Sequence, residues 1–227
     1  MTPDPKRIDP AARLSIVHNP SVVEKRPSSD EVDRVRERLG SPKGPVIAHT
    51  VTLEVNQGID LLLESFAGFL AAFPGATLAV AGGTPEQIER HGERAQELGV
   101  ARGVRFLGRL PMEEMAPLMA AADVLVTCRN AGTNVPLKVY SCLQAERPIL
   151  ATDAPCHRSV LSPGVALLVR PAPGALAEGM ERLVRDRSFA RSLASRARLL
   201  WEAEYGWERH RGRIADWVRG ATRRKGR

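Results

Sequence analysis

The chain has few cysteines, few aromatic residues and no long apolar run. Its three cysteines, Cys128, Cys142 and Cys156, form no C-x-x-C pair, which argues against a disulfide framework and suits a reducing compartment. No histidine stands beside them at zinc-ligand spacing, so buried thiols are a better interpretation than a metal site. No stretch approaches the roughly 18 apolar residues of a membrane span, and residues 1–10 lack the apolar core of a signal peptide. We therefore expect a cytoplasmic protein without a metal.

Positive charge is in excess. The 227 residues carry a formal net charge of +7, and part of it falls between Arg209 and the closing RRKGR. A basic protein attracts nucleic acid, anionic lipid headgroups and sugar nucleotides alike, and charge alone does not choose among them. The absence of zinc-finger spacing and of an RNP-type aromatic signature, with only 4% aromatic residues, disfavours nucleic acid.

Short apolar runs alternate with helical stretches from about residue 46 to residue 185. The expected strands are VIAHTV (46–51), ATLAVAGG (76–83), VRFLG (104–108), DVLVTC (123–128), PILATD (148–153) and VALLVR (165–170). Continuous apolar strands separated by helices are typical of a parallel sheet covered on both faces. After the second strand, Thr84 and Gln87 form a capping box around Pro85, which predicts a helix start. The predicted fold class is α/β, a doubly wound, Rossmann-like parallel sheet.

The chain divides into three segments. Residues 1–43 read as a lead-in with one short helix, residues 44–200 as the Rossmann-like domain, and residues 201–227 as a basic, aromatic helix or tail. A helix with aromatic residues on one side and arginines on the other usually packs against another surface. We therefore expect a helical C-terminal extension that has a partner.

The loop after the fourth strand is the most informative one, because ligands of open α/β sheets bind outside the carboxyl ends of the strands. Thr133 or Asn134 can cap a helix that we expect to begin near Val135. The unpaired N–H groups of such a helix start attract phosphate, and Arg129 and Lys138 would add countercharge. An ordinary strand–turn–helix with normal capping is the alternative.

Residues 128–153, CRNAGTNVPLKVYSCLQAERPILATD, contain the pattern R-x-x-GTN-x-PLK-x-Y and resemble a subgroup of the family 4 glycosyltransferases. Similar motifs stand around it in the family's order: LEVNQGIDLLLESF, LAVAGG, VRFLGRLP, ADVLVT, RPILATD and YGWERH. The resemblance covers about residue 14 to residue 215. It implies a GT-B fold, with this chain as the single C-terminal-type domain that binds a UDP- or GDP-linked nucleotide sugar and needs no further cofactor.

The resemblance also implies where the nucleotide sugar lies. In the family, the base contacts the backbone after the third strand, and the diphosphate lies on the GTN-type loop and its helix. The glycine pair after the second strand would let the backbone approach the ligand, or would simply make a tight turn. The donor-binding residues predicted in this way are Gly82, Gly83, Gly108, Arg109, Leu110, Arg129, Gly132, Thr133, Asn134, Val135, Lys138 and Ser141.

Two departures from the family pattern concern charge. The family's paired glutamates, eight positions apart, fall on Thr133 and Ser141, and Ser141 offers only a single-hydroxyl contact to the ribose. The family's Arg/Lys pair falls near Thr52 and Gln57. Because charge-assisted hydrogen bonds are about twice as strong as neutral ones, the diphosphate would depend on Arg109 and the two basic residues of the loop.

Histidine supplies no catalytic pattern. His49 ends the first strand and His157 follows the fifth, and we expect both to be hydrogen-bonded structural residues. Neither a Ser-His-Asp set nor a carboxylate pair can be argued from the spacings, so no catalytic residue is assigned.

GT-B enzymes have two Rossmann-like domains, and SIVHNPSVV (15–23) is similar to the family's exit from the first one. We expect the donor-binding half of a retaining glycosyltransferase that lacks its N-terminal acceptor domain. It would be inactive alone and act with a partner chain, or be a truncated form. Its C-terminal segment would dock onto the missing half or, peripherally, onto an anionic membrane. The alternative is a non-catalytic nucleotide-binding or interaction module derived from the same fold.

Overall fold

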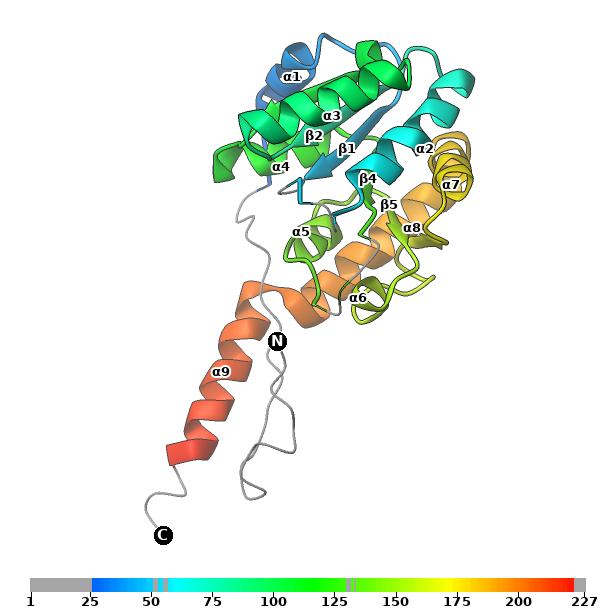
Figure 1. The fold of residues 1–227 in the computed structure, drawn as a ribbon. Helices are drawn as coiled ribbons and strands as arrows, with labels where there is room; N and C mark the ends of the chain where they lie inside the picture. The colour runs from blue at the N-terminus through cyan, green and yellow to red at the C-terminus, as the bar shows by residue number, and fades with distance from the viewer. Residues whose placement is uncertain (1–25, 51–52, 55–56, 130–131, 133, 223–227) are drawn as a thin grey trace.

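A single parallel sheet organises the chain. The computed structural model describes residues 26–50, 53–54, 57–129, 132 and 134–222. Six strands lie in the order β3-β2-β1-β4-β5-β6, and every neighbouring pair is parallel (Figure 1). They are β1 (Val46–Thr50), β2 (Thr77–Ala81), β3 (Val104–Gly108), β4 (Val124–Thr127), β5 (Ile149–Thr152) and β6 (Leu167–Val169). The predicted doubly wound sheet is confirmed, with each expected strand in place.

Helices cover both faces of the sheet. They are α1 (Ser29–Arg38), α2 (Ile59–Ala72), α3 (Pro85–Glu97), α4 (Met112–Ala121), α5 (Lys138–Gln144), α6 (Pro155–Arg158), α7 (Pro173–Arg185), α8 (Arg187–Leu200) and α9 (Trp207–Thr222), with a 3₁₀ turn (Ala101–Gly103) and a π-helical turn (Trp201–Tyr205). Successive strand residues alternate between two cores: Leu78 packs with α2, α3 and α7, whereas Ala79 packs with α1, α4 and α5. Both faces are therefore dry, which explains the continuous apolar runs.

The capping box after β2 forms as predicted. The Gln87 N–H donates to the Thr84 hydroxyl at 3.4 Å, and the Thr84 N–H donates to the Gln87 Oε1 at 2.9 Å. Pro85 occupies the first turn, where no N–H is needed. Helix α3 thus begins directly after the carboxyl end of β2.

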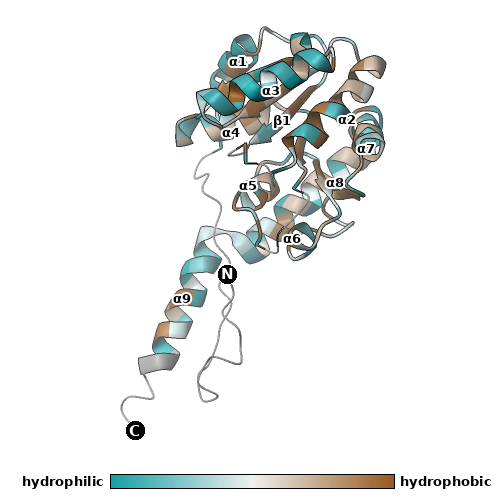
Figure 2. Cartoon of the chain, in the orientation of Figure 1, coloured by the Kyte–Doolittle hydropathy of each residue, from teal (hydrophilic) through white to brown (hydrophobic). Residues whose placement is uncertain are grey.

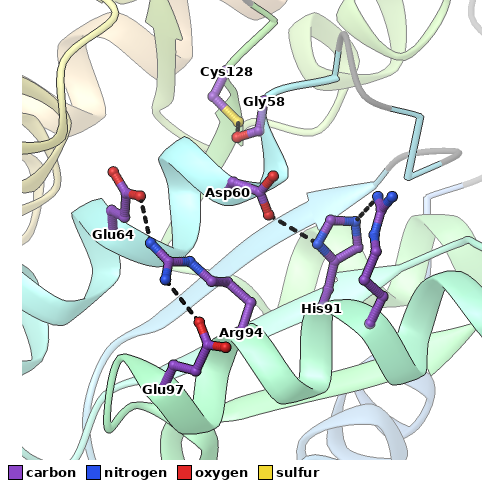
Figure 3. Close-up of polar contacts among 8 residues, drawn as sticks. Gly58, Asp60, Glu64, His91, Arg94, Glu97 and Cys128 are labelled. Atoms are coloured by element: carbon purple, nitrogen blue, oxygen red, sulfur yellow. Dashed lines mark hydrogen bonds and ion pairs between the residues drawn. The ribbon is translucent and has the colours of Figure 1, made fainter.

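Polar contacts hold α3 against α2 (Figure 3). The Arg94 guanidinium bridges Glu64 at 2.9 Å and Glu97 at 2.8 Å. The buried His91 ring meets Asp60 at 3.0 Å, and burial lowers the His91 pKa despite that carboxylate. The contacts to Asp60 and Glu64 link α3 to the first two turns of α2.

The start of α2 is fastened to the end of β4. Gly58, at φ +71°, precedes the helix, and the Cys128 thiol donates a hydrogen bond to its carbonyl at 3.1 Å (Figure 3). A Cβ added at Gly58 would lie 2.0 Å from the Cys128 carbonyl oxygen. Only glycine allows this close approach, which joins the loops after β1 and β4.

One predicted helix start is wrong. Helix α5 begins at Lys138 and not near Val135, and Leu137 stands at its N-cap position without a side-chain hydrogen bond. Asn134 therefore does not cap the helix, and Thr133 lies outside the described residues. The physical reason is Pro136, because a residue that precedes proline disfavours helical dihedrals and Val135 is held out of the helix.

The predicted helical extension is present as α9, which extends away from the body of the domain (Figure 1). Among the described residues, no helix has both the length and the apolar character needed to cross a bilayer.

Candidate functional site

A cleft of about 640 Å³ lies at the carboxyl edge of the sheet. It is centred where the strand order reverses between β1 and β4, the position at which doubly wound sheets bind ligands. The segments after β1, β2, β3 and β4 and the start of α5 line it: Thr50, Glu54, Gln57, Ala81, Gly82, Gly83, Thr84, Gln87, Arg109, Leu110, Met115, Arg129, Pro136, Leu137 and Lys138.

Half of the predicted donor-binding residues line this cleft. They are Gly82, Gly83, Arg109, Leu110, Arg129 and Lys138. A seventh, Gly108, is adjacent to it, because its carbonyl accepts a hydrogen bond from the Gly82 N–H at 2.6 Å. The loops after β2 and β3 are thus joined at the rim.

The other predicted residues are placed differently. Asn134 is exposed, and its carbonyl accepts a hydrogen bond from Arg129 Nη1 at 3.3 Å. Gly132, at φ +96°, lies against the same guanidinium, and Val135 packs against the core. Ser141 is buried and lines a different cavity, of about 550 Å³, between α1, α4 and α5. Within the described residues, the structure does not bring Ser141 to the cleft.

The glycine pair after β2 makes a tight turn that also borders the cleft. Gly83 has φ +88°, and a Cβ there would lie 2.3 Å from the Leu53 side chain. The packing against Leu53 accounts for this glycine without a ligand. Because Gly82 and Gly83 also line the cleft, their backbone is in a position to contact a ligand as well.

Lys138 places a buried amino group at the cleft. Its Nζ is buried and has no hydrogen-bond partner among the described residues, although the rest of the side chain is partly exposed. The thiols of Cys128, Cys142 and Cys156 are the nearby groups that would favour its charge. Burial raises the pKa of Cys128 and of Cys142 to about 12, so these thiols are neutral at pH 7. Burial is also the main cause that lowers the Lys138 pKa, with a smaller contribution from Arg129.

Arg129 adds a second cation. Its Nε is buried without a hydrogen-bond partner among the described residues, and its backbone carbonyl accepts a hydrogen bond from the Thr152 hydroxyl at 2.6 Å. The described part of the chain has four buried side-chain nitrogen or oxygen atoms without a partner. The two cationic ones both line the cleft, and the two neutral ones line the 550 Å³ cavity. Buried charges are normally paired, and neither of these two nitrogens has a partner among the described residues.

The two histidines near the cleft are structural, as predicted. The buried His49 ring donates through Nδ1 to the Val126 carbonyl at 2.8 Å. The buried His157 ring lies 3.0 Å from the Thr127 hydroxyl and 2.8 Å from the Thr152 carbonyl. Burial is the largest cause that lowers the pKa of each, so both rings are neutral at pH 7.

Sequence reasoning missed several cleft residues. Glu54 is the one acidic side chain among the described lining residues, and its Oε1 accepts a hydrogen bond from Gln87 Nε2 at 3.4 Å. Met115 and the exposed Leu137 contribute apolar surface. Glu54 and Met115 are distant in sequence from the fourth-strand loop, although Glu54 closely follows β1 and could have been found from the sheet topology.

The fold and cleft define a Rossmann-like α/β domain with a cleft lined by basic side chains at its topological switch point. Residues 31–200 match the family described as glycosyl transferases group 1, and the chain belongs to this family. The domain is therefore the C-terminal type found in GT-B glycosyltransferases.

Individual proteins are also similar to the chain in sequence or in fold. Over 142 residues the chain is 30% identical to the GDP-mannose-dependent alpha-(1-6)-phosphatidylinositol monomannoside mannosyltransferase of Mycolicibacterium smegmatis, covering 62% of this chain and 37% of that protein. Anabaena Alr3699/HepE, solved with UDP, superposes with a TM-score of 0.81 at 18% identity, covering 91% of this chain and 57% of that one. The isolated C-terminal domain of the group 1 protein LpcC from Francisella tularensis superposes with a TM-score of 0.62 at 18% identity, covering 84% and 97%.

Both full-length proteins in this comparison are longer than the chain. The chain spans about a third of the mannosyltransferase and somewhat more than half of the Anabaena protein, whereas it matches nearly the whole of the isolated C-terminal domain.

Proposed function

We propose that the cleft binds the diphosphate of a UDP- or GDP-linked sugar, and that the chain is the donor-binding half of a retaining glycosyltransferase. The observation that carries the proposal is a pair of buried nitrogens of basic side chains, Lys138 Nζ and Arg129 Nε. Neither has a hydrogen-bond partner among the described residues, and both lie at the switch point of a glycosyl transferases group 1 domain. A diphosphate supplies the charge and the acceptor oxygens that both groups lack.

We assign the base and the ribose to other residues that line the cleft. The base lies along the backbone of Arg109 and Leu110 after β3, next to the apolar surface of Met115 and Leu137. The ribose needs an acceptor for its hydroxyl hydrogens, and Glu54 provides a carboxylate within the cleft. We assign this contact to Glu54 in place of Ser141, because Ser141 lines the other cavity.

Two named relatives support a nucleotide-sugar ligand. The Mycolicibacterium protein depends on GDP-mannose, and the Anabaena protein was solved with UDP. The acceptor site and the catalytic group would be supplied by a second domain, on a partner chain or on the remainder of a longer protein. The isolated chain is expected to bind the donor and not to transfer its sugar.

Calorimetric titration with UDP, GDP, UMP and their sugars tests the proposal. We expect UDP or GDP to bind at millimolar affinity or better, and the matching monophosphate to bind more weakly. Lys138→Met and Arg129→Gln should each weaken binding about tenfold or more, the value of one charge-assisted hydrogen bond. Lys43→Met and Arg102→Gln are matched controls, because both positions are exposed and lie outside the cleft. Affinities unchanged by the cleft variants would refute the proposal.

The alternative, a non-catalytic nucleotide-binding or interaction module, is favoured by one observation. Thr133 and Ser141 occupy the positions of the family's paired glutamates. Absence of millimolar binding to every nucleotide and nucleotide sugar in the titration would support an interaction module. A second experiment supplies an acceptor domain and follows the reaction by NMR. Transfer of the sugar with retained anomeric configuration would exclude both a non-catalytic nucleotide-binding module and an interaction module.

A further inference from the structure

Arg129 leaves the sheet just beyond the last backbone pairing between β4 and β5. The ladder between these two strands ends with Thr127 opposite Ala151, two residues before Arg129. Thr152, the final residue of β5, continues the connection through its side chain, because its hydroxyl donates to the Arg129 carbonyl at 2.6 Å. This hydroxyl therefore ties the start of the loop after β4 to the neighbouring strand.

The Thr152 hydroxyl belongs to a buried polar cluster. Thr127, Thr152 and His157 are all fully buried, and the central strands around them are largely apolar (Figure 2). Buried polar groups in such surroundings need partners within the protein. The His157 Nε2 lies 3.0 Å from the Thr127 hydroxyl, and its Nδ1 lies 2.8 Å from the Thr152 carbonyl and 3.2 Å from the Thr152 hydroxyl.

The chemistry of these groups sets the direction of each hydrogen bond in the cluster. A carbonyl only accepts, so His157 Nδ1 carries the ring hydrogen and donates toward Thr152. The Nε2 of the neutral ring then accepts from the Thr127 hydroxyl. Because Thr152 Oγ1 faces the Nδ1–H group, its own hydrogen points to the Arg129 carbonyl. The hydrogen bonds thus run in one direction, from β4 through His157 to the loop.

The Arg129 residue is held at two points. Its carbonyl accepts from Thr152, and its Nη1 donates to the Asn134 carbonyl at 3.3 Å. A Cβ added at Gly132 would lie 3.1 Å from Nη2, so the loop passes close to the guanidinium. Between these two points, Nε is buried without a hydrogen-bond partner among the described residues. A shift of the backbone at Arg129 would move this nitrogen from its place at the cleft.

We propose that Thr152 is a positioning residue, which fixes the Arg129 guanidinium at the cleft by holding the Arg129 backbone. His157 and Thr127 act one step further back, because they orient the Thr152 hydroxyl. The effect on UDP affinity rests on the proposed function, whereas the ordering of Arg129 does not. A hydroxyl with a purely structural role would stabilise the sheet and leave the order of the guanidinium unchanged.

The order of the Arg129 side chain is measured first, by NMR of the full chain without a ligand. We expect its Nε–H group to exchange with water at least about tenfold more slowly than that of the exposed Arg102. Thr152→Val removes the hydroxyl and should abolish this protection, whereas Thr152→Ser keeps the hydroxyl and should retain it. Thr77→Val is the matched control, because Thr77 is a buried strand residue at the opposite end of the sheet.

Titration with UDP, or with GDP if GDP binds more tightly, then measures the consequence for the donor site. Thr152→Val should weaken binding about fivefold, near the value of one hydrogen bond, and Thr77→Val should change it by less than about twofold. In the Arg129→Gln background, Thr152→Val should have almost no further effect, because residues that act through one another are not additive. All variants are compared at a temperature at which circular dichroism shows them to be folded.

Four results would overturn the inference. The first is rapid exchange of the Arg129 Nε–H group in the unmodified protein, which requires no variant to fold. The second is unchanged protection in Thr152→Val, and the third is an equal loss of protection in Thr152→Ser. The fourth is an equal weakening of nucleotide binding by Thr152→Val with and without Arg129→Gln. If the unmodified protein binds neither nucleotide but Arg129 shows the expected pattern of protection, the proposed function fails and the positioning role of Thr152 stands.

Discussion

Replacing Lys138 by methionine should stabilise the folded protein and weaken its binding of a nucleoside diphosphate. The Nζ atom is buried without a hydrogen-bond partner among the described residues, and the thiols around it are neutral, so no described group offsets its charge when it is protonated. Methionine keeps most of the apolar stem and removes that charge. A residue that serves only the fold would give the opposite result for stability.

The burial of Lys138 Nζ sets the expected size of the changes in stability and in affinity. An unsatisfied buried polar group costs about 1–3 kcal/mol, so Lys138→Met should raise the free energy of unfolding by about 2 kcal/mol. For a chain of this size that corresponds to about 4–8 °C in Tm. The lost charge-assisted hydrogen bond to a diphosphate is worth about 1.5–3 kcal/mol, which is about 10- to 150-fold in Kd.

The pH dependence has a defined sign. The Lys138 pKa is lowered from 10.5 in the folded protein, so the unfolded chain binds more protons between the two values. The stability advantage of Lys138→Met is therefore complete below the lowered pKa and disappears as the pH rises to 10.5. UDP affinity of the unmodified protein should fall as the pH rises above the lowered pKa, because the charged form binds phosphate.

Thermal unfolding and calorimetry, at pH 7 and near pH 10, measure both effects. Lys43→Met is the control and should leave stability and affinity nearly unchanged, since Lys43 is exposed and outside the cleft. The reasoning is refuted if Lys138→Met lowers Tm, or if it binds UDP as tightly as the unmodified protein.

Three further predictions concern the scaffold. Gly58→Ala should cost about 3 kcal/mol or more in unfolding free energy by urea titration, because the new Cβ meets the Cys128 carbonyl at 2.0 Å. Gly99→Ala has the same φ of +71° with open space around it, so it should cost only about 1 kcal/mol, and equal losses would disprove the clash. Burial lowers the His157 pKa from 6.5, so the urea midpoint should fall as the pH drops below about 6.5, and His157→Gln should flatten that dependence. Arg94→Gln should leave the urea midpoint almost unchanged at physiological salt, because its ion pairs are exposed, and a large loss would contradict this.

The strands were predictable because their signal is local. Each strand is a short apolar run, and every residue of the four central strands is buried. The edge strands β3 and β6 are mostly partly buried. The start of α3 was predictable for a similar reason, since Thr84, Pro85 and Gln87 interact within four residues. The start of α5 differs from the prediction because Asn134 has a capping side chain, but Pro136 keeps Val135 out of the helix, which begins at Lys138.

Residue types and order in the chain determined the fold class and the edge of the sheet at which a ligand would bind. Only the tertiary structure decided which side chains reach that edge. It places Glu54 in the cleft, turns Ser141 toward another cavity, and buries Lys138 Nζ where no other described residue pairs with it. The reason is that burial and pairing depend on β1, β4 and β5 together, and these elements are up to about 100 residues apart in the sequence.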